Sequence, residues 1–175
     1  MHVYLIGMPG AGKSTVGKVL AEKLGRTFVD LDAAIEKMAG QIISEIFEKF
    51  GENYFRQLES EALKTVSFSE EKLVIATGGG TPCFHDNLDI MKKHGQVLYL
   101  KVTPEILAER LMALPLNSRP LLKEKSKSQL LSYLNQTLTT RSPFYEKAGI
   151  ILEAATVAET VAASLQKLIR EENPH

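Results

Sequence analysis

The segment from residue 7 to residue 14 constrains the fold more than any other part of the sequence. It is Gly-Met-Pro-Gly-Ala-Gly-Lys-Ser, a match to the pattern G-x-x-x-x-G-K-[ST]. An apolar run predicted as a strand precedes it, and a segment predicted as a helix follows it. Glycines let the backbone curl around a phosphate, and the helix directs its positive end to the same point. The segment therefore predicts a phosphate-binding loop; an ordinary glycine-rich turn is the alternative.

Within this loop, side chains and backbone have different predicted roles. Lys13 is expected to reach the β- and γ-phosphates of a nucleotide as a catalytic group, and the Ser14 hydroxyl to bind the Mg²⁺ that bridges them. The residues predicted to bind the nucleotide here are Gly10, Ala11, Gly12, Lys13, Ser14 and Thr15.

Apolar runs alternate with amphipathic stretches along the chain, which is typical of a parallel sheet covered by helices. The predicted strands are residues 2–6, 26–30, 72–76, 96–102 and 149–152. The predicted helices are residues 14–24, 31–39, 42–50, 52–68, 87–94, 104–113, 127–148 and 156–170. A length of 175 residues favours one domain, residues 1–175, with ligands bound at the carboxyl edge of the sheet.

Composition argues against several classes of partner. Lys plus Arg equals Asp plus Glu at 21 each, so nucleic acid and anionic membranes are not expected partners. The balanced charge and the absence of an evident exposed apolar stripe predict a monomer. No signal peptide or membrane-spanning run is visible, and the single cysteine fits a reducing, cytoplasmic location. The four histidines are scattered, without the spacing of a zinc site.

Asp30 and Asp32 follow the second predicted strand. Side chains alternate along a strand, so both carboxylates are expected on the same side. One of the two carboxylates could hold Mg²⁺ through water, while the other could orient and deprotonate an attacking hydroxyl. Helix capping by Asp32 is the alternative.

The chain has six arginines against fifteen lysines, and most arginines lie in segments that resemble site loops or helix ends. A guanidinium binds a carboxylate through two parallel hydrogen bonds, which lysine cannot do. Arg56, with Glu59 one helical turn on, and Arg141 would together suit a carboxylate on an acceptor molecule. Surface or salt-bridged arginines are the alternative.

Two further loops are candidates for the site. Gly78, Gly79 and Gly80 follow the third predicted strand and would allow a ligand to approach the backbone, unless they form a simple flexible turn. Arg119 lies in an irregular stretch, about residues 113–127, that is predicted to close over ATP as a lid and stabilise the transferring phosphoryl group. A plain exposed loop is the alternative there.

Nucleotide switches share the phosphate-binding loop, so they are the main alternative from another class. Their base-reading Asn-Lys-x-Asp and their Asp-x-x-Gly are absent from the expected places. Another small-molecule kinase, acting on gluconate or a nucleoside monophosphate, also remains open.

Taken in order, these motifs resemble the shikimate kinase family. The segments that carry the resemblance are residues 7–14, Asp30-Leu31-Asp32, Ile35-Glu36, residues 43–47, Gly51-Glu52, Phe55-Arg56 with Glu59, residues 78–80, residues 119–122, and Arg141 with Pro143 and Tyr145. The resemblance implies a three-layer α/β/α sandwich of the P-loop nucleoside-monophosphate-kinase type, with a five-stranded parallel sheet in the order 2-3-1-4-5. It implies transfer of the γ-phosphoryl group of ATP, with Mg²⁺, to the 3-hydroxyl of shikimate on the way to chorismate and the aromatic amino acids.

The resemblance also implies the following roles. Asp32 would meet the acceptor hydroxyls, Asp30 would support Mg²⁺, and Arg110 would lie against the adenine. Arg56 and Arg141 would hold the shikimate carboxylate, with Gly78, Gly79 and Gly80 lining the same site and Arg119 in the lid. Residues 31–62 would form the acceptor-binding segment.

Overall fold

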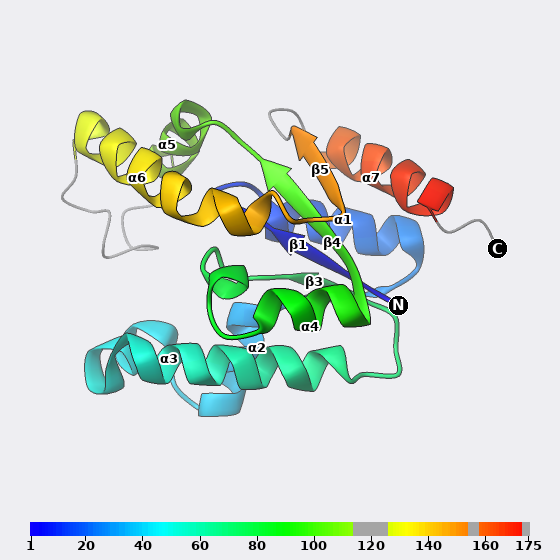
Figure 1. The fold of residues 1–175 in the computed structure, drawn as a ribbon, viewed down its shortest axis with the longest axis horizontal. Coiled ribbons are helices and arrows are strands. Elements are labelled where there is room, and N and C mark those ends of the chain that lie inside the picture. The colour runs from blue at the N-terminus through cyan, green and yellow to red at the C-terminus, as the bar shows by residue number, and fades with distance from the viewer. Residues whose placement is uncertain (114–125, 154–157, 173–175) are drawn as a thin grey trace.

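The computed structural model describes residues 1–113, 126–153 and 158–172 and forms a sheet between helices (Figure 1). The strands are β1 (His2–Ile6), β2 (Thr27–Asp30), β3 (Leu73–Ala76), β4 (Gly95–Lys101) and β5 (Ile150–Glu153). The helices are α1 (Lys13–Leu24), α2 (Leu31–Ala39), α3 (Ile43–Ser67), the short 3₁₀ helix η1 (Thr81–Cys83), α4 (Asn87–His94), α5 (Pro104–Met112), α6 (Lys127–Tyr145) and α7 (Ala158–Glu172).

All five strands pair in parallel, in the order β2-β3-β1-β4-β5. The central strand β1 is buried throughout, and its Leu5 pairs with Ala76 of β3 on one side and with Leu98 of β4 on the other. Helix α4 lies in front of the sheet in Figure 1 and α1 behind it, where α1 packs against α7. The three-layer α/β/α architecture and the strand order expected from the resemblance are confirmed.

Glycine determines where several helices end or bend. Gly25 and Gly40 end α1 and α2 in the left-handed conformation, with φ of 62° and 66°. Residues 42–50 and 52–68, predicted as two helices, form the single element α3, bent at Gly51, where φ is 78° and ψ is 178°. The predicted interruption is therefore present as a non-helical residue within α3.

Some predicted bounds are wrong by one to three residues. Helix α6 ends at Tyr145 rather than at residue 148, because the amides of Lys147 and Ala148 bond to carbonyls three residues back and form tight turns. The 3₁₀ helix η1 was not predicted, because Pro82 and the preceding glycines signal only a turn.

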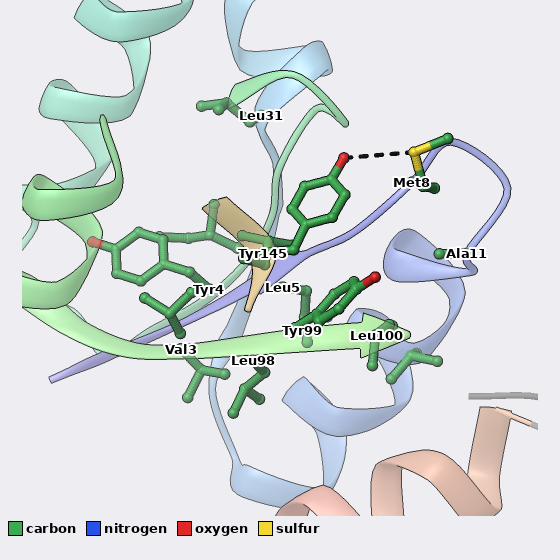
Figure 2. Close-up of a cluster of buried hydrophobic side chains, with 14 of the residues drawn as sticks. Val3, Tyr4, Leu5, Met8, Ala11, Leu31, Leu98, Tyr99, Leu100 and Tyr145 are labelled. Atoms are coloured by element: carbon green, nitrogen blue, oxygen red, sulfur yellow. Dashed lines mark hydrogen bonds between the residues drawn. The ribbon is translucent and has the colours of Figure 1, made fainter. Parts of the chain in front are cut away.

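Large side chains fill the space around β1. Tyr4 and Tyr145 are fully buried, and Figure 2 shows them with Tyr99 beside β1 and β4. The Tyr4 hydroxyl donates to Ser67 Oγ at 2.8 Å, so its polar end is paired inside the core. Within the described ranges, no helix is long and apolar enough to cross a membrane.

Buried His2 is expected to make the fold less stable in mild acid. Its Nδ1 accepts the Leu73 amide at 3.3 Å and its Nε2 lies 3.0 Å from Ser67 O, which suits a neutral ring protonated on Nε2. Burial lowers the pKa of His2 below 6.5, against an opposing effect of the Ser67 bond. The unfolded chain then binds a proton that the folded chain resists, so stability falls as the pH drops below about 6.5.

Urea denaturation at pH 7.5 and pH 5.5 tests this expectation. The loss of unfolding free energy between the two pH values should be smaller for His2→Gln than for the unchanged protein. The exposed His85, changed to Asn, serves as the control and should leave the loss unaltered. An equal loss in His2→Gln would mean that His2 does not contribute to the pH dependence.

Candidate active site

The phosphate-binding loop joins β1 to α1 and depends on three glycines with positive φ. These are Gly7 (141°), Gly10 (85°) and Gly12 (91°), a region that side chains rarely adopt. A Cβ on Gly7 would lie 2.7 Å from Leu100 O, so the loop also packs closely against the end of β4. Gly12 is the N-cap of α1 and has no side chain to accept the first-turn amides. The loop thus turns helix amides toward the carboxyl edge of the sheet, as a phosphate site requires.

Two cations contact the backbone of this loop. Lys13 is largely buried, and its Nζ donates to the carbonyls of Gly7 at 2.8 Å and Met8 at 3.0 Å. Arg110 reaches the loop from α5 and donates from Nη1 to Ala11 O at 3.3 Å. Positive charge is therefore concentrated where the phosphates of a nucleotide are expected to lie.

Ser14 and Asp30, the two residues expected near Mg²⁺, lie in contact. The Ser14 hydroxyl, in the first turn of α1, donates to Asp30 Oδ2 at 2.7 Å. Thr15, the next residue, is exposed.

The predicted relation between Asp30 and Asp32 is wrong in its geometry. Strand β2 ends at Asp30, and Asp32 already belongs to the first turn of α2, so strand alternation does not relate the two side chains. Asp30 is the N-cap: its Oδ1 accepts the amide of Asp32 at 3.1 Å. The proposed alternative, a cap made by Asp32, is therefore also wrong. The Asp32 carboxylate nevertheless lies near the loop after β3, since its Oδ1 would be 3.4 Å from a Cβ on Gly78.

The glycines after β3 lie where side chains from α2, α3, α6 and the phosphate-binding loop meet. The distance from a Cβ built on each glycine shows which side chains lie against it. On Gly78 this atom would be 2.8 Å from Glu59 Oε1, and on Gly80 it would be 2.7 Å from both Nη atoms of Arg56. On Gly79 it would be 2.9 Å from Arg141 Nη1 and 2.8 Å from Pro9 Cδ of the phosphate-binding loop. Arg56 and Arg141 therefore approach adjacent residues of one loop, beside the phosphate-binding loop.

Arg56 is held by several neighbours. Its Nη1 donates to Glu59 Oε2 at 2.8 Å, which confirms the pairing expected from their spacing. Its Nε and Nη2 both donate to Glu52 Oε1, at 3.2 and 3.0 Å. Its guanidinium carbon lies 4.1 Å from the centre of the Phe84 ring. Sequence reasoning missed Glu52 as a partner, although its spacing of four residues from Arg56 gave a usable signal.

Tyr145 links the loop after β3 to the phosphate-binding loop. Its hydroxyl donates to Gly79 O at 2.6 Å and lies 3.8 Å from Met8 Sδ, the contact drawn in Figure 2. Burial raises the pKa of Tyr145 well above its usual value, although nearby Arg141 opposes the shift. The phenol therefore stays protonated as a donor. It follows Arg141 by one helical turn of α6, so both side chains reach the same loop.

Arg119 and most of the predicted lid, residues 114–125, lie outside the described residues. The remaining predicted site residues come from α1, β2, α2, α3, α5, α6 and the loops after β1 and β3. All of these segments meet at the carboxyl edge of the sheet.

A nucleotide switch needs only the phosphate-binding loop, whereas transfer of a phosphoryl group also needs a neighbouring site that binds an acceptor. Arg56 and Arg141, gathered at the loop after β3 beside the phosphate-binding loop, define the class: a P-loop kinase acting on an anionic small molecule. The family model described as Shikimate kinase matches residues 9–170. The chain belongs to the shikimate kinase family, the enzymes that phosphorylate shikimate in the shikimate pathway.

Individual relatives agree with the family model over nearly the whole chain. The shikimate kinase of Parabacteroides distasonis is 45% identical over 153 residues, 87% of each chain. That of Bacteroides fragilis is 40% identical over 174 residues, 97% of this chain and 96% of the relative. The crystal structure of shikimate kinase from Bacteroides thetaiotaomicron superposes with a TM-score of 0.93 at 38% identity, covering 97% of this chain and 98% of that one. The family predicted from the sequence is confirmed.

A second solved structure is informative about ligands. Shikimate kinase from Acinetobacter baumannii, in complex with shikimate, has a TM-score of 0.88 and 38% identity to this chain, covering 99% of this chain and 95% of that one.

Proposed function

We propose that this chain transfers the γ-phosphoryl group of ATP, bound with Mg²⁺, to the 3-hydroxyl of shikimate, giving shikimate 3-phosphate and ADP. The observation that carries the proposal is the approach of Arg56 and Arg141 to adjacent glycines beside the phosphate-binding loop. The shikimate complex of the Acinetobacter baumannii relative supports the same acceptor. The proposal treats residues 1–175 as one kinase domain, with residues 31–62 binding the acceptor and residues 113–127 acting as a lid.

The acceptor carboxylate would bind between the two arginines. Of the five N–H groups of Arg56, three are used by Glu52 and Glu59, which leaves one hydrogen on each Nη atom. Two hydrogens on neighbouring nitrogens match the two oxygens of a carboxylate. Arg141 would add charge from the other side of Gly79, and the backbone of residues 78–80 would allow the ring of shikimate to approach.

On the nucleotide side, Lys13 would neutralise charge on the β- and γ-phosphates, and the amides of Gly10, Gly12, Ser14 and Thr15 would bind phosphate oxygens. The Ala11 amide donates to Met8 O at 3.1 Å and would help to hold the loop in shape. Arg110 already contacts the loop backbone and would extend from there toward the nucleotide. Arg119 would act from the lid on the charge of the transferring group.

The residues near Ser14 fit Mg²⁺ bound mainly by phosphates and water. The Ser14 hydroxyl gives its hydrogen to Asp30, so its lone pairs can point toward a cation. Among the described residues, no group of three or more His, Cys, Asp or Glu side chains could hold a metal, and Mg²⁺ in kinases usually needs no such group. Mg²⁺ would supply charge neutralisation on the phosphates, with Asp30 fixing the orientation of Ser14.

Asp32 would accept the hydrogen of the attacking hydroxyl and orient it. Asp32→Asn keeps the size of the side chain but removes its charge, so kcat is expected to fall by about 100-fold while the KM for ATP changes by less than about threefold. Steady-state kinetics with each substrate varied in turn test this expectation. Equal losses in turnover and in ATP binding would instead assign Asp32 to the metal site.

The overall proposal is tested by measuring ADP formation with and without shikimate. ADP formation should depend on shikimate and on Mg²⁺. Neither gluconate nor a nucleoside monophosphate should replace shikimate as the acceptor. Phosphorus NMR of the product should show a phosphate ester at the 3-position. ATP hydrolysis without any dependence on shikimate would contradict the proposal.

A further inference from the structure

We propose that Thr81 and Phe84, in the turn directly after the triple glycine, are positioning residues that hold the Arg56 guanidinium in the orientation that binds the acceptor carboxylate. This inference rests on the proposed function, because it concerns how the acceptor site is built. Both residues act through Arg56 and are not assigned a contact with the substrate.

Thr81 acts through Glu59. Both residues are fully buried, and Thr81 Oγ1 donates to Glu59 Oε1 at 2.6 Å. The other oxygen, Glu59 Oε2, accepts from Arg56 Nη1 at 2.8 Å. Each carboxylate oxygen thus has its own donor, and the carboxylate cannot rotate without weakening one of these two bonds. Without the hydroxyl, both oxygens of this buried carboxylate would compete for Arg56 and draw the guanidinium away from the acceptor.

The position of Thr81 is itself fixed. Its amide donates to Gly78 O at 3.2 Å, and its carbonyl accepts from Asn87 Nδ2 at 3.0 Å. Asn87 is fully buried at the start of α4. The orientation of Glu59 therefore depends on η1 and α4 as well as on its own helix.

Phe84 restricts Arg56 by direct contact. The guanidinium carbon lies 4.1 Å from the Phe84 ring centre, closer than the 5.1 Å to Phe55. The Nη atoms also pack against the backbone of Gly80, where a Cβ would be only 2.7 Å away. The electron-rich ring and this backbone limit the directions in which the free Nη hydrogens can point.

Thr81→Val tests the hydroxyl, because valine has nearly the same shape. We expect the KM and the Kd for shikimate to rise about tenfold, while the KM for ATP stays within twofold. Thr81→Ser keeps the hydroxyl and should restore the shikimate values to within about threefold. A shikimate KM for Thr81→Val within twofold of the unchanged protein would overturn the role of Thr81, as would an equal rise in both KM values.

Phe84→Leu provides a second test at a half-buried position, and it remains decisive if Thr81→Val does not fold. The KM for shikimate should rise about threefold to fivefold with that for ATP unchanged, and Phe84→Tyr, which keeps the ring, should match the unchanged protein. An unaltered shikimate KM in Phe84→Leu would overturn the role of Phe84.

A double substitution tests whether the effect passes through Arg56. In an Arg56→Lys background, Thr81→Val should raise the KM for shikimate by less than about twofold further, because the guanidinium that Thr81 helps to position is absent. A full tenfold further rise would overturn the inference. These outcomes are distinct from failure of the proposed function, which would appear as absence of shikimate-dependent turnover in the unchanged protein.

Discussion

Lys13→Ala is expected to lower kcat by about 100-fold to 1,000-fold, the usual consequence of removing one group that stabilises charge in a transition state. The Lys13 ammonium lies over the phosphate-binding loop, bonded to the carbonyls of Gly7 and Met8. From there it can follow the charge that develops on the transferring phosphoryl group. Coupled measurement of ADP release at saturating ATP and shikimate gives the turnover directly.

Lys18→Ala is the matched control for this experiment, since Lys18 lies on the same helix with an exposed side chain. It should leave kcat within about twofold. Thermal melts of both variants should show folded protein. If Lys13→Ala kept turnover within tenfold of the unchanged protein, phosphate stabilisation would have to come mainly from the loop amides and Mg²⁺.

Arg56→Lys is expected to lower kcat/KM for shikimate by about 100-fold, although the positive charge is retained. Lysine cannot reproduce the paired contacts to Glu52 or present two hydrogens to a carboxylate. It would also give the buried Glu59 a weaker partner. The KM for ATP should change by less than about threefold, because the role proposed for Arg56 is to bind the acceptor and not the nucleotide. Kinetics at varied shikimate, together with calorimetric titration of shikimate, measure the effect.

Arg26→Lys serves as the matched control. Arg26 lies just before β2, at the opposite end of the strand from the site, and contacts the Met1 carbonyl at 3.3 Å. Near-normal shikimate affinity in Arg56→Lys would contradict the argument that a forked guanidinium is required.

Sequence alone predicted the parts of the site that depend on contiguous residues. The phosphate-binding loop, the triple glycine and the Arg56–Glu59 pair each lie within one short segment, so spacing was enough to find them. The relative orientation of Asp30 and Asp32 was predicted wrongly because β2 ends at Asp30 and α2 begins at the next residue. The alternation of side chains along a strand therefore does not extend to Asp32.

Contacts between distant segments gave no local signal. Arg110 contacts Ala11 across 99 residues, and Thr81 contacts Glu59 across 22. Phe84 could not be assigned to Arg56 either, since an aromatic residue after a turn is usually interpreted as packing. These contacts depend on the order of strands and on the path of α3, which composition and periodicity do not determine.

The pairing of β1 with β3 has a consequence for changing the acceptor by protein engineering. Leu5 pairs with Ala76, and each is followed two residues later by the first glycine of its loop, Gly7 or Gly78. Main-chain hydrogen bonds therefore set the distance between the phosphate-binding loop and the loop after β3. Adding one residue to either strand would move its loop by about 3.3 Å, as much as the distance between reacting atoms. New acceptor preferences should be reachable by exchanging side chains around Gly78, whereas loop insertions at these two strand ends should abolish transfer.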